Sequence, residues 1–165
     1  MLNRRSPLLV ALVCAAAPLA AGCGGGTHTS HTHRHKREVL LHASLGFGAF
    51  RRFIAAPAHA GQLSDPLSLA SKNASSAAAF ADKELRLAAH NVQRSKRLRV
   101  LFAPLELTAE EIKALAPALS RPSSLAQVEA ISRILSRLAM VAEANGARIK
   151  YASLASIAAA GGPRT

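Results

Sequence analysis

The strongest structural signal in the chain is a run of apolar residues near the C-terminal end that recur at helical spacing. The run comprises Leu125, Val128, Ile131, Leu135 and Leu138, with Val141 or Ala142 as its last member. Residues three or four positions apart share one face of an α-helix, so the run predicts an amphipathic helix. Arg133 and Arg137 fall on the opposite, polar face.

Both ends of this helix carry capping signals. Ser124-Leu125-Ala126-Gln127 has the spacing of a capping box, in which the serine and glutamine side chains bond to backbone N–H groups of the first turn. Asn145-Gly146 is typical of the left-handed position that ends a helix.

Four further segments have helical spacing or a helix-start signal, and we expect helices over 37–54, 64–91, 108–119 and 148–160. Gly46 and Gly48 lie inside the first, where they would let a neighbouring helix approach closely. Pro57 and Gly61 are expected to end it. In the second, Asp82 and Arg86 have the spacing of a helical ion pair.

The starts of two of these helices, over 64–91 and 108–119, are predicted from specific residues. Ser64-Asp65-Pro66 combines a capping side chain with a proline suited to a first turn. Thr108-Ala109-Glu110-Glu111 has the pattern of a second capping box, and the helix that it opens is interrupted near Pro117.

No segment shows the alternation of a β-strand, so the predicted fold is all-α, a small bundle of four to five helices in one domain over 37–161 with a tail at 162–165. Alanine accounts for 36 of the 165 residues, tryptophan is absent, and there are one tyrosine and five phenylalanines. Because alanine buries little area, the core depends on few large side chains and the stability is expected to be modest.

The first 22 residues have the composition of a secretory signal peptide. Arg4 and Arg5 precede an apolar run from Pro7 to Ala20 that ends in small residues. That run is too short for a permanent membrane-spanning helix, which needs about 20 apolar residues.

The run closes as Leu19-Ala20-Ala21-Gly22-Cys23, which resembles the lipobox of bacterial lipoproteins. The resemblance covers these residues only, and no family is recognised for the rest of the chain. It implies that a dedicated peptidase cuts before Cys23, that the thiol of Cys23 carries a diacylglycerol and that the new amine is often acylated with a fatty acid such as palmitate. The protein would then be exported and lipid-anchored on the extracytoplasmic side of a cell membrane. The alternative is an ordinary signal peptide, with Cys23 as an incidental cysteine.

Residues 23–36 have no hydrophobic periodicity and are interpreted as a flexible tether. The tether begins with three glycines and contains His28, His31, His33 and His35. Imidazole is a good ligand for zinc, copper and nickel, so the tract is a candidate metal site. The alternative is a polar, partly protonated spacer that lies near anionic headgroups.

The densest basic run contains Arg94, Lys96, Arg97 and Arg99 within six positions. It is a candidate site for phosphate or an anionic lipid surface, and the alternative is a solvated connection between helices. An exported chain with one tyrosine and no interleaving of aromatic and basic residues argues against nucleic acid as a partner.

The chain has no motif for catalysis. It lacks a Gly-x-Ser-x-Gly turn, a phosphate loop and a dinucleotide fingerprint, and a lipidated Cys23 leaves the mature domain without a free thiol. We therefore expect a non-catalytic helical domain that binds or scaffolds another component of the cell envelope. The alternative is a metal- or small-ligand-handling lipoprotein that uses the histidine tract or a pocket between helices lined by His42, Phe47 and Phe50.

The anchor is tested by replacing Cys23 with serine. Because a hydroxyl does not receive the diacylglycerol, we expect Cys23→Ser to remove the mass of the lipid and, in membranes washed with high salt, to move the protein to the soluble fraction. Membrane fractionation and intact-mass spectrometry measure both effects. A variant that stays in the membrane fraction at an unchanged mass would show that Cys23 is not lipidated.

Overall fold

The computed structural model describes residues 27–164, and α-helices with short 3-10 and π turns are its only regular elements. The predicted all-α class is therefore confirmed for the described part of the chain. The predicted signal peptide and Cys23 lie outside these residues.

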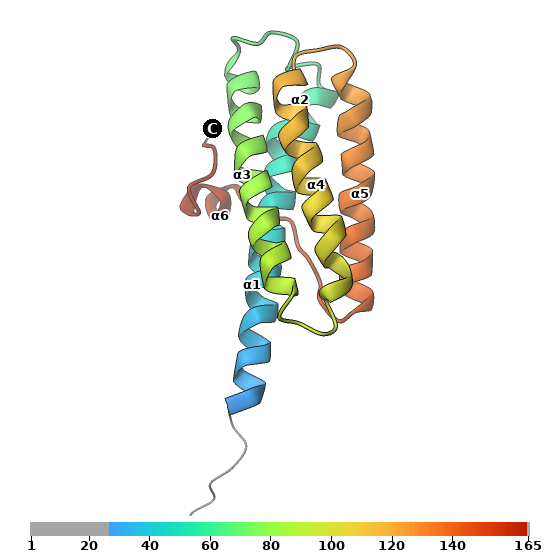
Figure 1. The fold of residues 1–165 in the computed structure, drawn as a ribbon. Coiled ribbons are helices and arrows are strands. Elements are labelled where there is room, and N and C mark those ends of the chain that lie inside the picture. The colour runs from blue at the N-terminus through green and yellow to red at the C-terminus, as the bar shows by residue number, and fades with distance from the viewer. Residues whose placement is uncertain (1–26, 165) are drawn as a thin grey trace, which may run out of the picture.

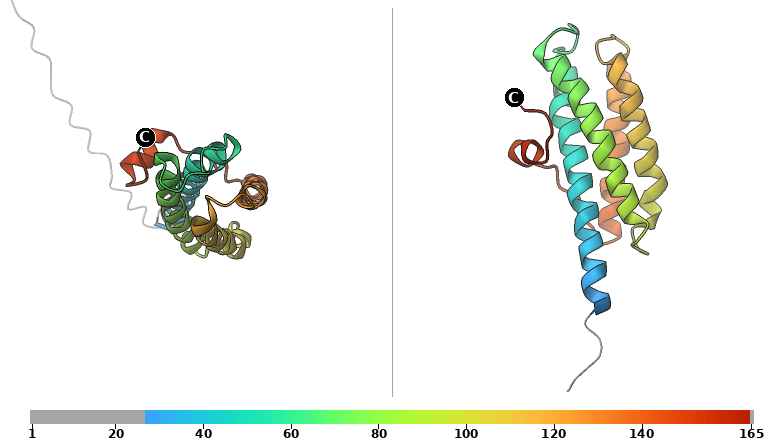
Figure 2. Two further views of the ribbon diagram at one scale, coloured as in Figure 1. Left: turned by 90° about the horizontal axis from the view of Figure 1, so that it is seen from above. Right: turned by 60° about the vertical axis from the view of Figure 1, so that its left-hand side comes forward.

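Four long helices pack side by side as an up-and-down bundle (Figure 1). They are α1 (Thr27–Ala49), α3 (Leu69–Val92), α4 (Phe102–Leu115) and α5 (Ser124–Ala144). A short helix α6 (Leu154–Ala159) lies outside the bundle against α1 (Figure 2). The 3-10 turns η2 (Arg99–Leu101) and η3 (Ala116–Ala118) flank α4.

The first helix continues beyond its predicted end. A π-helical turn, η1 (Phe50–Ala55), joins α1 to α2 (Ala56–His59), and the Ala56 N–H donates to the carbonyl of Arg51, five residues earlier. This wider turn ends at Ala55, two residues before Pro57, whose ring would clash with the carbonyl four residues earlier in a regular α-helix. The prediction that Pro57 ends the helix is wrong, whereas Gly61 does follow its end, with φ at +67°.

The same segment could lie in a membrane or in the core of the bundle. Residues Arg34–His59 are long and apolar enough, by length and composition alone, to cross a membrane. However, 61% of the most apolar stretch is buried inside the bundle. Burial of that kind is typical of a core helix, as its position against α3 indicates.

Small residues set the spacing between α1 and its neighbours. A Cβ atom at Gly46 would lie 3.1 Å from the side chain of Leu85 on α3, so the helices approach closely, as predicted. At Gly48 the neighbour is not a helix but the extended chain before α6. A Cβ there would lie 2.8 Å from the backbone nitrogen of Ala152, which donates a hydrogen bond to the carbonyl of Ser44.

The helix α5 confirms the clearest sequence pattern. Its buried face comprises Val128, Ile131, Leu135, Leu138 and Ala142, whereas Arg133 and Arg137 are exposed. Leu125, in the first turn of α5, is instead 39% exposed. Gly146 has φ at +77° and the Ala147 N–H donates to the carbonyl of Ala142, which is the predicted C-cap.

The predicted starts of α3 and α4 are wrong, because the expected capping side chains bond elsewhere. Helix α3 begins after Ser68, whose Oγ accepts from the Ser71 N–H, and Asp65 instead caps a local turn by accepting from the Leu67 N–H. Helix α4 begins six residues before the predicted box. Thr108 lies inside it, and its hydroxyl donates to the carbonyl of Pro104, a proline in the first turn, where no N–H is needed.

The ends of the last two predicted helices also differ in detail. The Ser124 hydroxyl donates to the carbonyl of Leu119 and does not cap α5, although that helix spans the predicted residues. In the C-terminal segment only Leu154–Ala159 is helical. Residues 148–153 are extended because the Ala152 backbone bonds to α1 and Ser153 caps α6.

The predicted flexible tether is partly wrong, since residues 27–36 form the first turns of α1. Extending a formed helix by one residue costs far less than starting one, and none of these residues is glycine or proline. An ion pair at helical spacing, from Arg34 Nε to Glu38 Oε1 at 3.1 Å, supports this part of the helix. Figure 1 shows it projecting from one end of the bundle.

Candidate functional site

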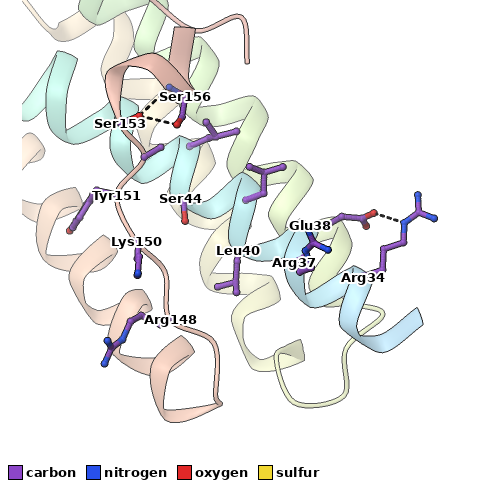
Figure 3. Close-up of a pocket in the computed structure, with 13 residues that line it drawn as sticks. Arg34, Arg37, Glu38, Leu40, Ser44, Arg148, Lys150, Tyr151, Ser153 and Ser156 are labelled. Atoms are coloured by element: carbon purple, nitrogen blue, oxygen red, sulfur yellow. Dashed lines mark hydrogen bonds and ion pairs between the residues drawn. The ribbon is translucent and has the colours of Figure 1, made fainter. Parts of the chain in front are cut away.

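The main candidate site in the described part of the chain is a groove between α1 and the C-terminal segment, with a volume of about 1140 Å³ (Figure 3). Its lining comes from residues 34–45 and residues 148–156, two stretches about a hundred positions apart in the sequence. We refer to it as the α1 groove.

The α1 groove has an apolar floor and a cationic rim. Leu40, Leu41 and Leu45 line it from α1, and Leu41 is 56% exposed although it is a large apolar side chain. The four cations of the rim are Arg34 and Arg37 on α1 and Arg148 and Lys150 on the opposite wall.

Two of these cations already have partners. Arg34 donates to Glu38, and this hydrogen bond lowers the pKa of the Glu38 carboxyl. Arg148 pairs with Glu143 at 2.6 Å. Among the described residues no ion pair involves Arg37 or Lys150. The rim therefore presents positive charge that the described acidic residues do not balance.

The wall formed by the C-terminal segment is held in place by aromatic and backbone contacts. The ring centroid of Tyr151 lies 6.3 Å from that of Phe47, and the guanidinium carbon of Arg51 lies 4.7 Å from the Tyr151 centroid. The backbone bond from Ala152 to Ser44 fixes the same segment along α1. These contacts fix the C-terminal segment against α1, so both walls of the α1 groove have defined positions.

The three residues of the predicted interhelical pocket have different surroundings. His42 Nδ1 lies 2.7 Å from Glu84 Oε2 on α3, Phe47 packs against Tyr151, and Phe50 is buried in the core. Glu84 is itself buried, so His42 is the partner that makes this burial tolerable. The geometry assigns His42 a structural part in the α1–α3 contact.

The histidines of the predicted metal tract fall on a helix. Because α1 begins at Thr27, positions 28, 31 and 35 are related by three- and four-residue steps and follow one side of the helix, whereas position 33 does not. On the same side His35 Nδ1 lies 3.5 Å from Glu38 Oε2. Among the residues whose side chains are described, no group of three His, Cys, Asp or Glu could hold a metal ion.

The basic run forms the connection between α3 and α4. Arg94, Lys96, Arg97 and Arg99 are exposed, while Ser95 and Leu98 between them are buried and fix the turn. The guanidinium of Arg99 also donates to the carbonyl of Gln93 at 3.1 Å. Figure 1 places this connection at the end of the bundle from which the first turns of α1 project.

Comparison of the chain with protein-family models, with curated proteins and with solved structures finds no match.

The buried pair between α1 and α3 can be tested by mutation. His42→Ala leaves the Glu84 carboxylate buried without its partner, so we expect a loss of about 2–4 kcal/mol in the free energy of unfolding. Urea denaturation followed by circular dichroism measures it.

The exposed pair Arg148–Glu143 provides the matched control, and Arg148→Ala should cost less than about 1 kcal/mol. The double variant His42→Ala, Glu84→Ala should be less destabilised than the sum of its single changes. Strict additivity would show that the two side chains do not stabilise each other.

Proposed function

We propose that this protein is a membrane-anchored lipoprotein whose helical domain binds another component of the cell envelope in the α1 groove. The observation that carries the proposal is the combination of a leucine floor with a cationic rim in one built depression. The anchor itself is inferred from the lipobox-like residues that end at Cys23.

The chemistry of the α1 groove favours an anionic, partly apolar partner segment. Covering the exposed leucine surface displaces water from it and stabilises the complex by about 25 cal/mol for each Å² covered. The cations around it select against basic partners and attract acidic ones over distances near the Debye length of about 8–10 Å. A protein segment with apolar and acidic residues satisfies both conditions, and it needs no chemical step, so we propose a non-catalytic role.

Site-specific crosslinking tests this function. With a photo-reactive amino acid in place of Leu41, we expect a discrete crosslinked product in native membranes. The pair of changes Arg37→Glu and Lys150→Glu should reduce its yield at least about tenfold, because the rim would then repel an acidic segment.

Two controls make the result specific. Arg133→Glu with Arg137→Glu changes the charge equally on the exposed face of α5 and should leave the yield unchanged. The same photo-reactive residue at Leu107, an exposed position on α4, should give no such product. Equal crosslinking from both positions, or equal loss with both charge-reversed pairs, would contradict binding in the α1 groove.

The helical register favours metal handling as a second candidate function. His31 and His35 are four residues apart, the spacing at which two histidines on a helix share a metal ion, and His28 and Glu38 extend the same side. We propose that zinc, copper or nickel binds on this side of α1, with His33 outside the ligand set.

Calorimetric titration of zinc into the mature chain carrying Cys23→Ser tests the second candidate. His31→Ala with His35→Ala should abolish the binding heat, since the chelating pair is lost. His33→Ala serves as the control and should leave the affinity within about twofold of the parent. Loss of binding with His33→Ala alone would indicate a disordered histidine tract in place of a helical site.

A further inference from the structure

The two ends of the bundle differ sharply in charge. One end carries the connection between α3 and α4, with Arg94, Lys96, Arg97 and Arg99, which we call the cationic end. No Asp or Glu occurs between Arg86 and Glu106 in the sequence. The opposite end carries residues 60–68 and 116–123, which together contain one acid, Asp65, and one cation, Arg121.

The cationic end is also the end at which the chain enters the bundle. The first turns of α1 project from it, and ten helical residues from Thr27 correspond to a rise of about 15 Å (Figure 1). Arg34, Lys36 and Arg37 lie on this part of α1 or where it meets the bundle, so they add to the same field. Arg34 is paired with Glu38, and among the described residues no ion pair involves Lys36 or Arg37.

An exposed apolar residue lies within the cationic end. Val100 is 59% exposed next to Arg99, and a shallow depression lined by Arg99, Val100 and Phe102 adjoins it. Clustered cations around an exposed apolar side chain are the combination by which peripheral proteins bind anionic bilayers, since the charges attract the headgroups and the apolar group enters the interface.

We propose that the cationic end binds the surface of an anionic phospholipid bilayer directly, independently of the lipid anchor. The bundle then lies tilted on the membrane, with the α3–α4 connection and the first turns of α1 toward the headgroups and the opposite end toward the aqueous space. This contact goes beyond the proposed partner binding in the α1 groove and does not require it. The attraction is one of charge, because the cations are exposed and make few directional bonds.

Vesicle co-sedimentation tests the proposal with the mature chain carrying Cys23→Ser, which has no lipid of its own. We expect binding to vesicles of phosphatidylglycerol and phosphatidylcholine, little binding to phosphatidylcholine alone, and a steep loss between low salt and 0.5 M salt. Arg94→Gln, Lys96→Gln and Arg97→Gln together should weaken the binding at least about tenfold, since each cation near an anionic surface contributes about fivefold.

A matched control removes three exposed cations elsewhere. Arg52→Gln, Lys72→Gln and Arg121→Gln lower the net charge equally and should change the binding less than about threefold. Arg94→Lys with Arg97→Lys keeps the charge and should retain binding, whereas a site that depends on bidentate arginine bonds would lose it. Circular dichroism melting curves establish that each variant is folded.

Equal losses in the two triple variants, or equal binding to neutral and anionic vesicles, would overturn the proposal. Loss of binding in the lysine variant would overturn it too, in favour of a specific phosphate site. Failure of Leu41 crosslinking would leave the vesicle result unchanged, so the membrane contact and the partner site are tested separately. A fall of affinity in Val100→Ser on anionic vesicles would support entry of this side chain into the interface.

Discussion

The close packing of α1 on α3 is the contact on which the rest of the structure depends. The buried face of α3 is built mainly from alanines, including Ala74, Ala77, Ala78, Ala81 and Ala88, and Gly46 lies opposite Leu85. Small side chains at a helix interface allow the backbones to approach, so dispersion contacts compensate for the few large residues available. A chain rich in alanine can thus close one core, provided that these helices stay in register.

Register at this interface is fixed by polar as well as apolar contacts. Glu84 on α3 is buried and reaches His42 on α1, so sliding either helix by one turn would leave a carboxylate without its partner. Arg86, two positions on, bonds to Asp82 on its own helix and to Glu106 on α4. These pairs tie three helices together along α3, and the same placement of α1 positions Gly48 to receive the C-terminal segment that completes the α1 groove.

The sequence predicts helices well and their starts poorly, for an identifiable physical reason. Periodicity in α5 reports burial of a whole face, which many contacts enforce, and the predicted core residues from Val128 to Leu138 are buried as expected. A capping box reports one or two hydrogen bonds worth about 1 kcal/mol each, which tertiary contacts override. Thr108 and Ser124 illustrate this, since each hydroxyl bonds to a carbonyl four or five residues earlier. The α1 groove could not be predicted at all, because its walls meet only in the folded chain.

The helical path from Thr27 would link the proposed anchor at Cys23 to both proposed binding surfaces. Only three residues, all of them glycine, separate Cys23 from the start of α1 at Thr27, so a lipid on Cys23 would hold the helix close to the membrane. The first ten residues of α1 rise about 15 Å, which exceeds the Debye length of about 8–10 Å, so the axis of α1 must tilt toward the bilayer plane for the charges of the cationic end to act on the headgroups. The α1 groove runs along the same helix and its Arg34 and Arg37 lie nearest this end. An acidic segment bound there would therefore compete with anionic lipid for Arg34 and Arg37. Binding of the partner segment in the α1 groove would then be weaker at a membrane rich in anionic lipid.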